Sequence, residues 1–166
     1  MPKTFTCWMV RLLVVGMLLG VVVEQGGARA QGLYLGAGLS GPTDFQEFTP
    51  KISLQAGINP LPMFGARIAV DSIIQLSQFS IVSADALYRY SLPLSPVTIY
   101  VGGGPEFYLG NARPGFTRDD VLGVHATGGA EFRLGQYGLY GELQPGLTLG
   151  SGNAIVKLRV GVNLHF

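Results

Sequence analysis

The last ten residues of the chain, 157–166, alternate strictly between apolar and polar side chains and end on an aromatic residue. Successive side chains of a β-strand point to opposite faces, so this period of two predicts a strand with two chemically different faces. One face carries Leu158, Val160, Val162, Leu164 and Phe166, and the other carries Lys157, Arg159, Asn163 and His165. The fold must therefore offer this strand one apolar and one polar environment.

The same alternation recurs in seven earlier stretches, which turn-forming residues separate. The expected strands are residues 32–40, 51–59, 64–71, 82–90, 97–107, 122–133, 137–144 and 157–166. The connections alternate between long (41–50, 73–80, 108–120, 145–154) and short (59–63, 92–96, 134–136). An even number of strands with this rhythm predicts an all-β fold, an eight-stranded antiparallel up-and-down barrel with its short turns at one end. Glycines 102–104 and Pro105, inside the fifth strand, predict a kink or bulge.

Residues 1–30 have the pattern of a cleavable secretory signal peptide. Lys3 and Arg11 give a positive start, residues 12–23 are apolar or glycine, and Ala28-Arg29-Ala30 matches an A-x-A cleavage site. The apolar run is shorter than the roughly 20 residues that a membrane-spanning helix needs. We therefore expect two parts, the signal peptide at 1–30 and a barrel at 31–166.

Charge and cysteine content exclude several classes of function. The whole chain has 11 Lys and Arg and 10 Asp and Glu, of which the expected signal contains three and one, leaving 8 basic and 9 acidic residues. This balance offers no basic surface for nucleic acid. The single cysteine, Cys7, lies in the expected signal, so the barrel has neither a disulfide nor a cysteine-based metal site. We expect no metal and no cofactor, because His125 and His165 lack ligand spacing and Asp119-Asp120 fits a solvated turn.

Alternation alone does not say which face of the barrel points outward. A soluble, secreted carrier similar to lipocalins would turn its polar face to water, whereas a membrane barrel would turn its apolar face to lipid. No position of the apolar face is charged, and the polar face mixes charges with many glycines, which suits a crowded lumen. Aromatic residues of the apolar face fall next to the short turns and form an expected periplasmic girdle: Phe64, Tyr88, Tyr90, Phe132, Tyr137 and Phe166. At the other end only Phe107 is comparable. These features favour the membrane barrel.

The alternating terminal strand that ends in Phe166, with the signal and the loop rhythm, resembles the small outer-membrane β-barrels of the OmpA/OmpX type. The resemblance implies a bacterial outer-membrane location and a monomer surrounded by outer-membrane lipids and lipopolysaccharide. It also implies that the barrel-assembly machinery reads the terminal strand, whose signal residues would be Val162, Leu164 and Phe166. The likeness is one of architecture and carries no catalytic residue.

The polar face places ten charged side chains in the lumen: Arg67, Asp71, Asp85, Arg89, Glu106, Glu131, Arg133, Glu142, Lys157 and Arg159. Five negative and five positive groups balance, as a narrow and largely dehydrated lumen requires. His125 and His165 join them, and Tyr34, Tyr100 and Tyr140 fill volume between them. We expect a mostly closed, salt-bridged lumen in a structural or surface membrane protein. The alternative is a narrow, porin-like channel for ions or small solutes.

Two further functions depend on other residues. The long loops could bind an extracellular ligand, for which the candidate residues are Phe45, Phe48, Arg113, Phe116 and Arg118. Enzymatic action on lipid A would need a nucleophile, a base and an acid that open on the lipid. The nearest such group is His125, Thr127 and Glu131, whose strand face points inward, so we expect no enzyme.

Overall fold

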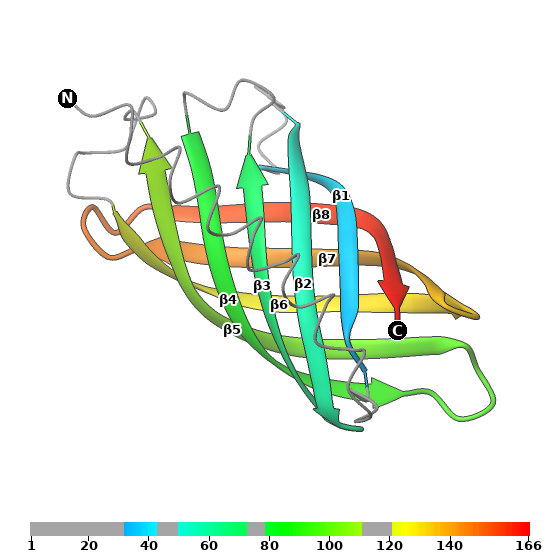
Figure 1. The fold of residues 1–166 in the computed structure, drawn as a ribbon. Coiled ribbons are helices and arrows are strands. Elements are labelled where there is room, and N and C mark those ends of the chain that lie inside the picture. The colour runs from blue at the N-terminus through cyan, green and yellow to red at the C-terminus, as the bar shows by residue number, and fades with distance from the viewer. Residues whose placement is uncertain (1–31, 43–49, 73–78, 111–120) are drawn as a thin grey trace. The chain divides into compact units, whose positions relative to one another are not determined.

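The computed structural model describes residues 32–42, 50–72, 79–110 and 121–166. Eight antiparallel strands form one closed barrel in sequence order, as Figure 1 shows. They are β1 (Tyr34–Pro42), β2 (Lys51–Leu61), β3 (Phe64–Ser72), β4 (Phe79–Ser91), β5 (Val97–Gly110), β6 (Leu122–Leu134), β7 (Tyr137–Thr148) and β8 (Ala154–His165). The predicted eight-stranded up-and-down barrel is therefore confirmed. No helix among the described residues is long and apolar enough to span a membrane.

The barrel closes where the first strand meets the last. β1 pairs with β8 from Tyr34 opposite His165 to Pro42 opposite Lys157, and on its other side β1 pairs with β2. Every strand thus has two hydrogen-bonded neighbours, and the sheet has no free edge. Closure of this kind satisfies the backbone polar groups within the sheet, which a strand surrounded by lipid requires.

Several strands run further than the alternation predicts. β7 continues to Thr148 and β8 starts at Ala154, so half of the expected loop 145–154 is strand and only residues 149–153 connect the two. The expected short turn at 59–63 is likewise reduced, because β2 continues to Leu61 with a shift of register between Ile58 and Leu61. Hydrogen bonds to a neighbouring strand decide where a strand ends, and glycine or proline near its end does not by itself interrupt them.

The glycine run in β5 produces a bend without a bulge. The pairing register with β4 and with β6 is the same on both sides of Gly103, and Figure 1 shows β5 curving strongly along its length. A Cβ on Gly102, Gly103 or Gly104 would lie 2.1, 2.2 or 1.9 Å from a backbone oxygen of a neighbouring strand. The absence of side chains lets the strands approach closely at this bend, as glycine kinks do in curved sheets.

The side chains are distributed in the opposite way to those of a soluble protein. Inward-facing positions hold charged and polar groups, and large apolar side chains such as Leu54, Ile68, Val101 and Leu143 are exposed on the outside. Soluble proteins rarely expose a continuous apolar surface of this kind. The distribution therefore contradicts the soluble-carrier alternative. A soluble carrier needs a polar outer face, and the outer face of this barrel is apolar.

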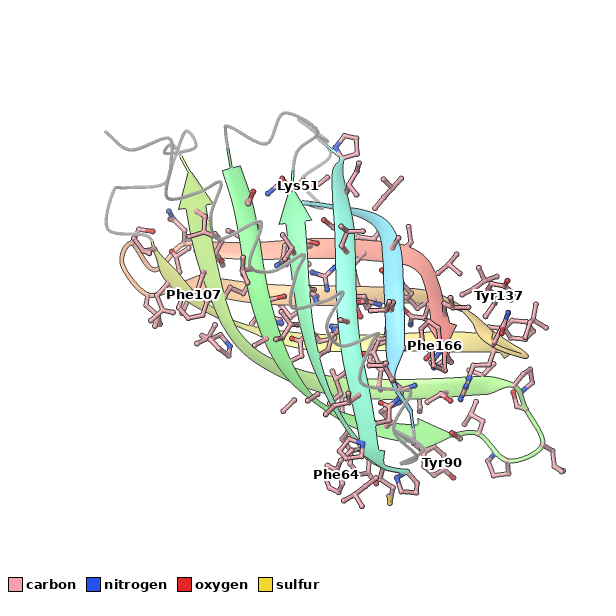
Figure 2. All side chains as sticks on the ribbon, viewed as in Figure 1. Lys51, Phe64, Tyr90, Phe107, Tyr137 and Phe166 are labelled. Carbon is pink, nitrogen blue, oxygen red and sulfur yellow. The ribbon has the colours of Figure 1, made fainter. Side chains whose placement is uncertain are left out.

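The six aromatic residues of the expected girdle all lie on the outer face and are exposed. The rings of Phe64 and Tyr88 pack edge to face with centroids 5.7 Å apart on adjacent strands. In Figure 2, the labelled Phe64, Tyr90, Tyr137 and Phe166 lie toward the end of the barrel with the short turns, whereas Phe107 lies toward the other end. Aromatic rings at one rim are suited to a membrane–water interface.

Candidate functional site in the barrel lumen

The interior of the barrel concentrates nearly all the charge that the structure describes. Ten charged side chains point inward, and each residue is at most 6% exposed: Lys51, Arg67, Asp71, Asp85, Arg89, Glu106, Glu131, Glu142, Lys157 and Arg159. Each sits on a strand whose alternate residues face outward and are apolar, and this alternation is what directs it inward. The five carboxylates and five cations balance, but the members differ from those predicted by one exchange.

Arg133 is the predicted network member that the structure excludes. It has the inward parity of β6 but lies one residue before the end of that strand and is exposed. Lys51, at the first position of β2, is buried instead. Both residues have the polar-face parity, so parity cannot separate them. Their positions along the barrel axis distinguish the two residues, because Arg133 lies where the lumen opens at the short-turn end.

Arg67 connects three strands across the lumen. Its Nε donates to Asp85 Oδ2 at 2.7 Å on the adjacent strand β4. Its Nη1 lies 2.7 Å from Glu142 Oε2 on β7, four strands away in either direction around the barrel. The planar guanidinium offers several donors in fixed directions, so one side chain can bind two carboxylates. This contact places a salt bridge across the middle of the lumen.

Glu142 is the carboxylate with the largest number of described donors. Oε2 accepts from Arg67 Nη1 at 2.7 Å and from Tyr100 Oη at 2.8 Å. Oε1 accepts from Arg159 Nη1 at 2.8 Å and from Gln144 Nε2 at 2.9 Å. A buried carboxylate needs such compensation, because taking it out of water without partners is costly.

Further contacts extend these pairs into a closed ring. Arg159 Nη2 lies 2.7 Å from Asp71 Oδ2, and Lys157 Nζ lies 4.0 Å from the same oxygen. Lys157 also contacts Glu106. His125 lies between two carboxylates: its Nδ1 is 3.3 Å from Glu106 Oε1, and its Nε2 contacts Asp85. In order, the ring consists of Arg67, Asp85, His125, Glu106, Lys157, Asp71, Arg159 and Glu142. It joins residues of β3, β4, β5, β6, β7 and β8.

A second group of polar side chains lies nearer the short-turn end. Glu131 Oε2 accepts from Arg89 Nη2 at 2.9 Å, and Glu131 Oε1 accepts from Asn163 Nδ2 at 3.2 Å and lies 2.5 Å from His165 Nε2. Gln55 connects this group to the ring, because its Nε2 donates to Asn163 at 2.6 Å and its Oε1 accepts from Arg67 at 3.1 Å. The polar contacts therefore extend along the lumen.

Aromatic rings fill the space that inward-facing glycines leave. A Cβ on Gly57 would lie 2.4 Å from Tyr34 Cζ, and a Cβ on Gly38 would lie 2.8 Å from Tyr140 Oη. The guanidinium of Arg89 lies 6.0 Å from the ring centre of Tyr34, within the range of cation–π attraction. Large side chains set opposite glycine are the packing expected in a barrel of eight strands.

The remaining predicted sites have different outcomes. The loop candidates Phe45, Phe48, Arg113, Phe116 and Arg118 lie outside the described residues. His125, Thr127 and Glu131 do not form a catalytic group: His125 contacts Asp85 and Glu106, Thr127 accepts from Gln144, and Glu131 contacts Arg89 and His165. Within the described ranges, no cluster of three or more His, Cys, Asp or Glu side chains is arranged to hold a metal ion.

Comparison with models of protein families finds no match, and comparison with curated proteins finds none either. Solved structures do match. The N-terminal β-barrel domain of Pseudomonas aeruginosa OprF is 15% identical over 82% of this chain and 98% of that one, with a TM-score of 0.60. Neisserial surface protein A is 15% identical over 84% and 99%, with a TM-score of 0.54. The Yersinia pestis outer membrane protein Ail, in a phospholipid bilayer nanodisc, is 10% identical over 82% and 99%, with a TM-score of 0.55. The chain thus has the fold of the small eight-stranded β-barrels of bacterial outer membranes.

Proposed function

We propose that this chain is an integral protein of a bacterial outer membrane whose lumen is closed by salt bridges. Its role would be that of a structural or surface membrane protein, with ligand binding by the long loops as an additional function. The observation that carries the closed lumen is the ring in which carboxylates alternate with Arg, Lys and His side chains, and in which Arg67 and Glu142 meet across the barrel. The apolar outer surface and the aromatic girdle support the membrane location.

Salt bridges of this kind oppose conduction for an energetic reason. An ion that passes through the ring must displace at least one carboxylate–guanidinium contact, and breaking a buried pair by removing one partner costs about 3–5 kcal/mol. Tyr34 and Tyr140 occupy the neighbouring space beside Gly57 and Gly38. A hydrated ion therefore meets both packed side chains and paired charges.

Planar-bilayer conductance of the refolded protein tests this proposal. A heat-modifiable gel shift first establishes that the barrel is folded. A closed lumen predicts a silent bilayer with well-folded protein. A steady and reproducible conductance step would contradict the closed lumen and would favour the narrow channel.

The narrow channel is the second candidate, and one observation favours it. Polar and charged side chains line much of the lumen, with Lys157, Arg159, Asn163 and His165 on β8 and Arg67 and Asp71 on β3. A pore needs such a lining, and rearranged salt bridges would leave these polar groups along the path of an ion. The two candidates differ in whether the charge ring opens on the timescale of a conductance measurement.

The partners that we propose follow from the membrane location. Outer-membrane phospholipid and lipopolysaccharide would cover the apolar surface of a monomeric barrel. The barrel-assembly machinery would read the terminal strand, where Val162 and Phe166 are exposed on the outer face. Separation of cell membranes would test the location, because the protein should be recovered with the outer membrane and absent from the periplasmic fraction.

We propose no enzymatic activity. Nε2 of His125 contacts Asp85 and Nδ1 lies 3.3 Å from Glu106, so both ring nitrogens lie beside carboxylates and neither is paired with a hydroxyl nucleophile. The lipid A pattern of cells that produce the protein should therefore match that of cells that do not. A new lipid A species that depends on His125 or Thr127 would contradict this expectation.

A further inference from the structure

Each of the three short turns at one end of the barrel exposes at least one large apolar side chain. Leu61 and Met63 lie at the β2–β3 turn, Leu92 and Leu94 at the β4–β5 turn, and Leu134 at the β6–β7 turn. We call these five residues the turn-end rim. Turns that project into water usually carry polar residues. Ser95 and Gln136 are exposed polar residues of these turns, but large apolar side chains are exposed beside them, so the rim needs another explanation.

Leu94 is the most exposed member of the rim and has an unfavourable backbone conformation. Its φ is 58°, the only positive φ among the described residues other than glycine, and its relative exposure is 110%. Leucine seldom adopts this left-handed conformation, for which glycine or asparagine would be better suited. The turn therefore presents a large apolar side chain at the position where a small residue would be least strained.

Arg133 is the only exposed charged residue in the part of the chain that the structure describes, and it lies at the same end. It precedes Leu134 in β6, and its backbone N–H donates to Pro96 O of the β4–β5 turn at 2.8 Å. This contact places the β6–β7 and β4–β5 parts of the rim side by side. A single cation beside exposed leucines suits the border of a membrane, where the apolar acyl chains meet the phosphate groups.

The rim is also continuous with the apolar outer surface of the barrel. Phe64 follows Met63 directly, Phe132 precedes Arg133, and Tyr90 precedes the β4–β5 turn. Val82 lies on the outward face of β4, and Leu92 continues the same parity one residue beyond the end of that strand. Ten residues at about 3.3 Å each, tilted by about 40°, span roughly 25 Å, the height of the apolar band of an outer-membrane barrel. A band that starts at Val82 therefore reaches the turn.

We propose that the turn-end rim lies in the phospholipid headgroup layer of the inner leaflet, and that Arg133 binds the phosphate of an anionic phospholipid there. The short turns are thus membrane-contacting surfaces. This inference rests on the proposed placement of the barrel in the outer membrane, with its short turns on the periplasmic side.

Single tryptophan reporters test the position of the rim. The natural chain has one tryptophan, Trp8, so Trp8→Phe gives a background without any. Leu94→Trp reports on the rim, and Leu143→Trp reports on the exposed outer face of the barrel. The proteins are refolded into phosphatidylcholine–phosphatidylglycerol vesicles whose acyl chains carry bromine either near the headgroup or near the chain end. We expect the fluorescence of Leu94→Trp to be blue-shifted and quenched by bromine near the headgroup.

The two reporters distinguish the possible failures. If Leu143→Trp is quenched but Leu94→Trp emits as in water and is not quenched, the rim lies in water, available to a periplasmic protein, and the inference is wrong. If neither reporter is quenched, the membrane placement itself, and with it the proposed function, is wrong.

The lipid preference is measured with Leu134→Trp, next to Arg133. Bromine is carried by either phosphatidylglycerol or phosphatidylcholine, and quenching is compared between Arg133, Arg133→Gln and the charge-conserving Arg133→Lys. A cation near an anionic surface contributes about 1 kcal/mol, so the preference for phosphatidylglycerol should reach up to about fivefold. It should persist in Arg133→Lys and disappear in Arg133→Gln. Equal quenching by both lipids in all three proteins would overturn the role of Arg133.

Discussion

Arg67 and Glu142 lie on opposite sides of a closed barrel, and 2.7 Å separates Arg67 Nη1 from Glu142 Oε2. β3 and β7 are four strands apart in both directions, so this salt bridge crosses the lumen along its widest path. It also joins the two sides of the ring, since Arg67 continues to Asp85 and Glu142 continues to Arg159. The contact thus affects both the stability of the barrel and the permeability of its lumen.

Replacement of Glu142 by Gln should destabilise the barrel strongly. The variant removes the charge that Arg67 and Arg159 share and leaves two buried guanidinium groups with one carboxylate partner each. Removing one partner of a buried pair costs about 3–5 kcal/mol, and the remaining partners should reduce this to roughly 2–4 kcal/mol. Urea unfolding in lipid vesicles measures the free energy of unfolding. Gln136→Ala, at an exposed turn position, is the control and should change it by less than about 0.5 kcal/mol.

Variants of the lumen carboxylates should raise conductance if the salt bridges close the lumen. Glu131→Gln weakens the group with Arg89 and His165, and Glu142→Gln weakens the ring. Planar-bilayer recordings should then show openings that the natural protein lacks, because paired charges no longer hold the side chains across the lumen. Gel shifts of both variants must confirm folding. Silent bilayers for both folded variants would refute control of conductance by these pairs and leave packing as the barrier.

Gly104→Ala should destabilise the barrel much more than Gly128→Ala. A Cβ on Gly104 would lie 1.9 Å from the backbone oxygen of Ala84, whereas a Cβ on Gly128 would meet nothing within 4 Å. A backbone oxygen in a paired strand cannot move aside easily, so the expected cost for Gly104→Ala is about 1–3 kcal/mol. Thermal unfolding of the two variants, monitored by the gel shift, makes the comparison. Equal melting temperatures would show that the bend of β5 does not depend on close strand contact.

Leu143→Arg distinguishes a lipid-facing from a water-facing outer surface. Leu143 is 51% exposed on the outside of β7. In a bilayer, a charge at this face should cost about 2–4 kcal/mol if it lies near the midplane, whereas in water the same substitution should be nearly neutral. The free energy of unfolding in vesicles, compared with Leu143→Ala, gives the result. A neutral effect would argue against burial of this face in lipid.

Phe166→Ala should impair assembly more than stability. The ring is exposed on the outer face at the end of β8, so its removal takes away little internal packing. We expect a smaller folded fraction in cell membranes but near-normal unfolding of the protein refolded without the assembly machinery. Tyr137→Ala, which removes an equally exposed girdle aromatic on the neighbouring strand, is the matched control. Equal losses in cells for both variants would show that position 166 carries no special signal.

Much of the barrel could be read from the sequence, because a period of two is a local property of a strand. Alternation at 157–166 assigns Arg159 to one face and Val160 to the other without reference to any other part of the chain. The number of strands and the position of the aromatic girdle follow from the same reasoning. The ends of the strands could not be predicted from the alternation, because pairing with β8 extends β7 to Thr148 despite the nearby proline and glycine.

The pairing of the charges was decided only by the tertiary structure. Parity directs Arg67 and Glu142 inward, but closure of the sheet and the tilt of its strands determine that these two residues meet. The same holds for Lys51 and Arg133, which have equal parity and different burial, because the height of a residue along the barrel axis depends on the register of all eight strands. Side-chain direction is a local consequence of the sequence, whereas contact across a lumen is a property of the closed barrel.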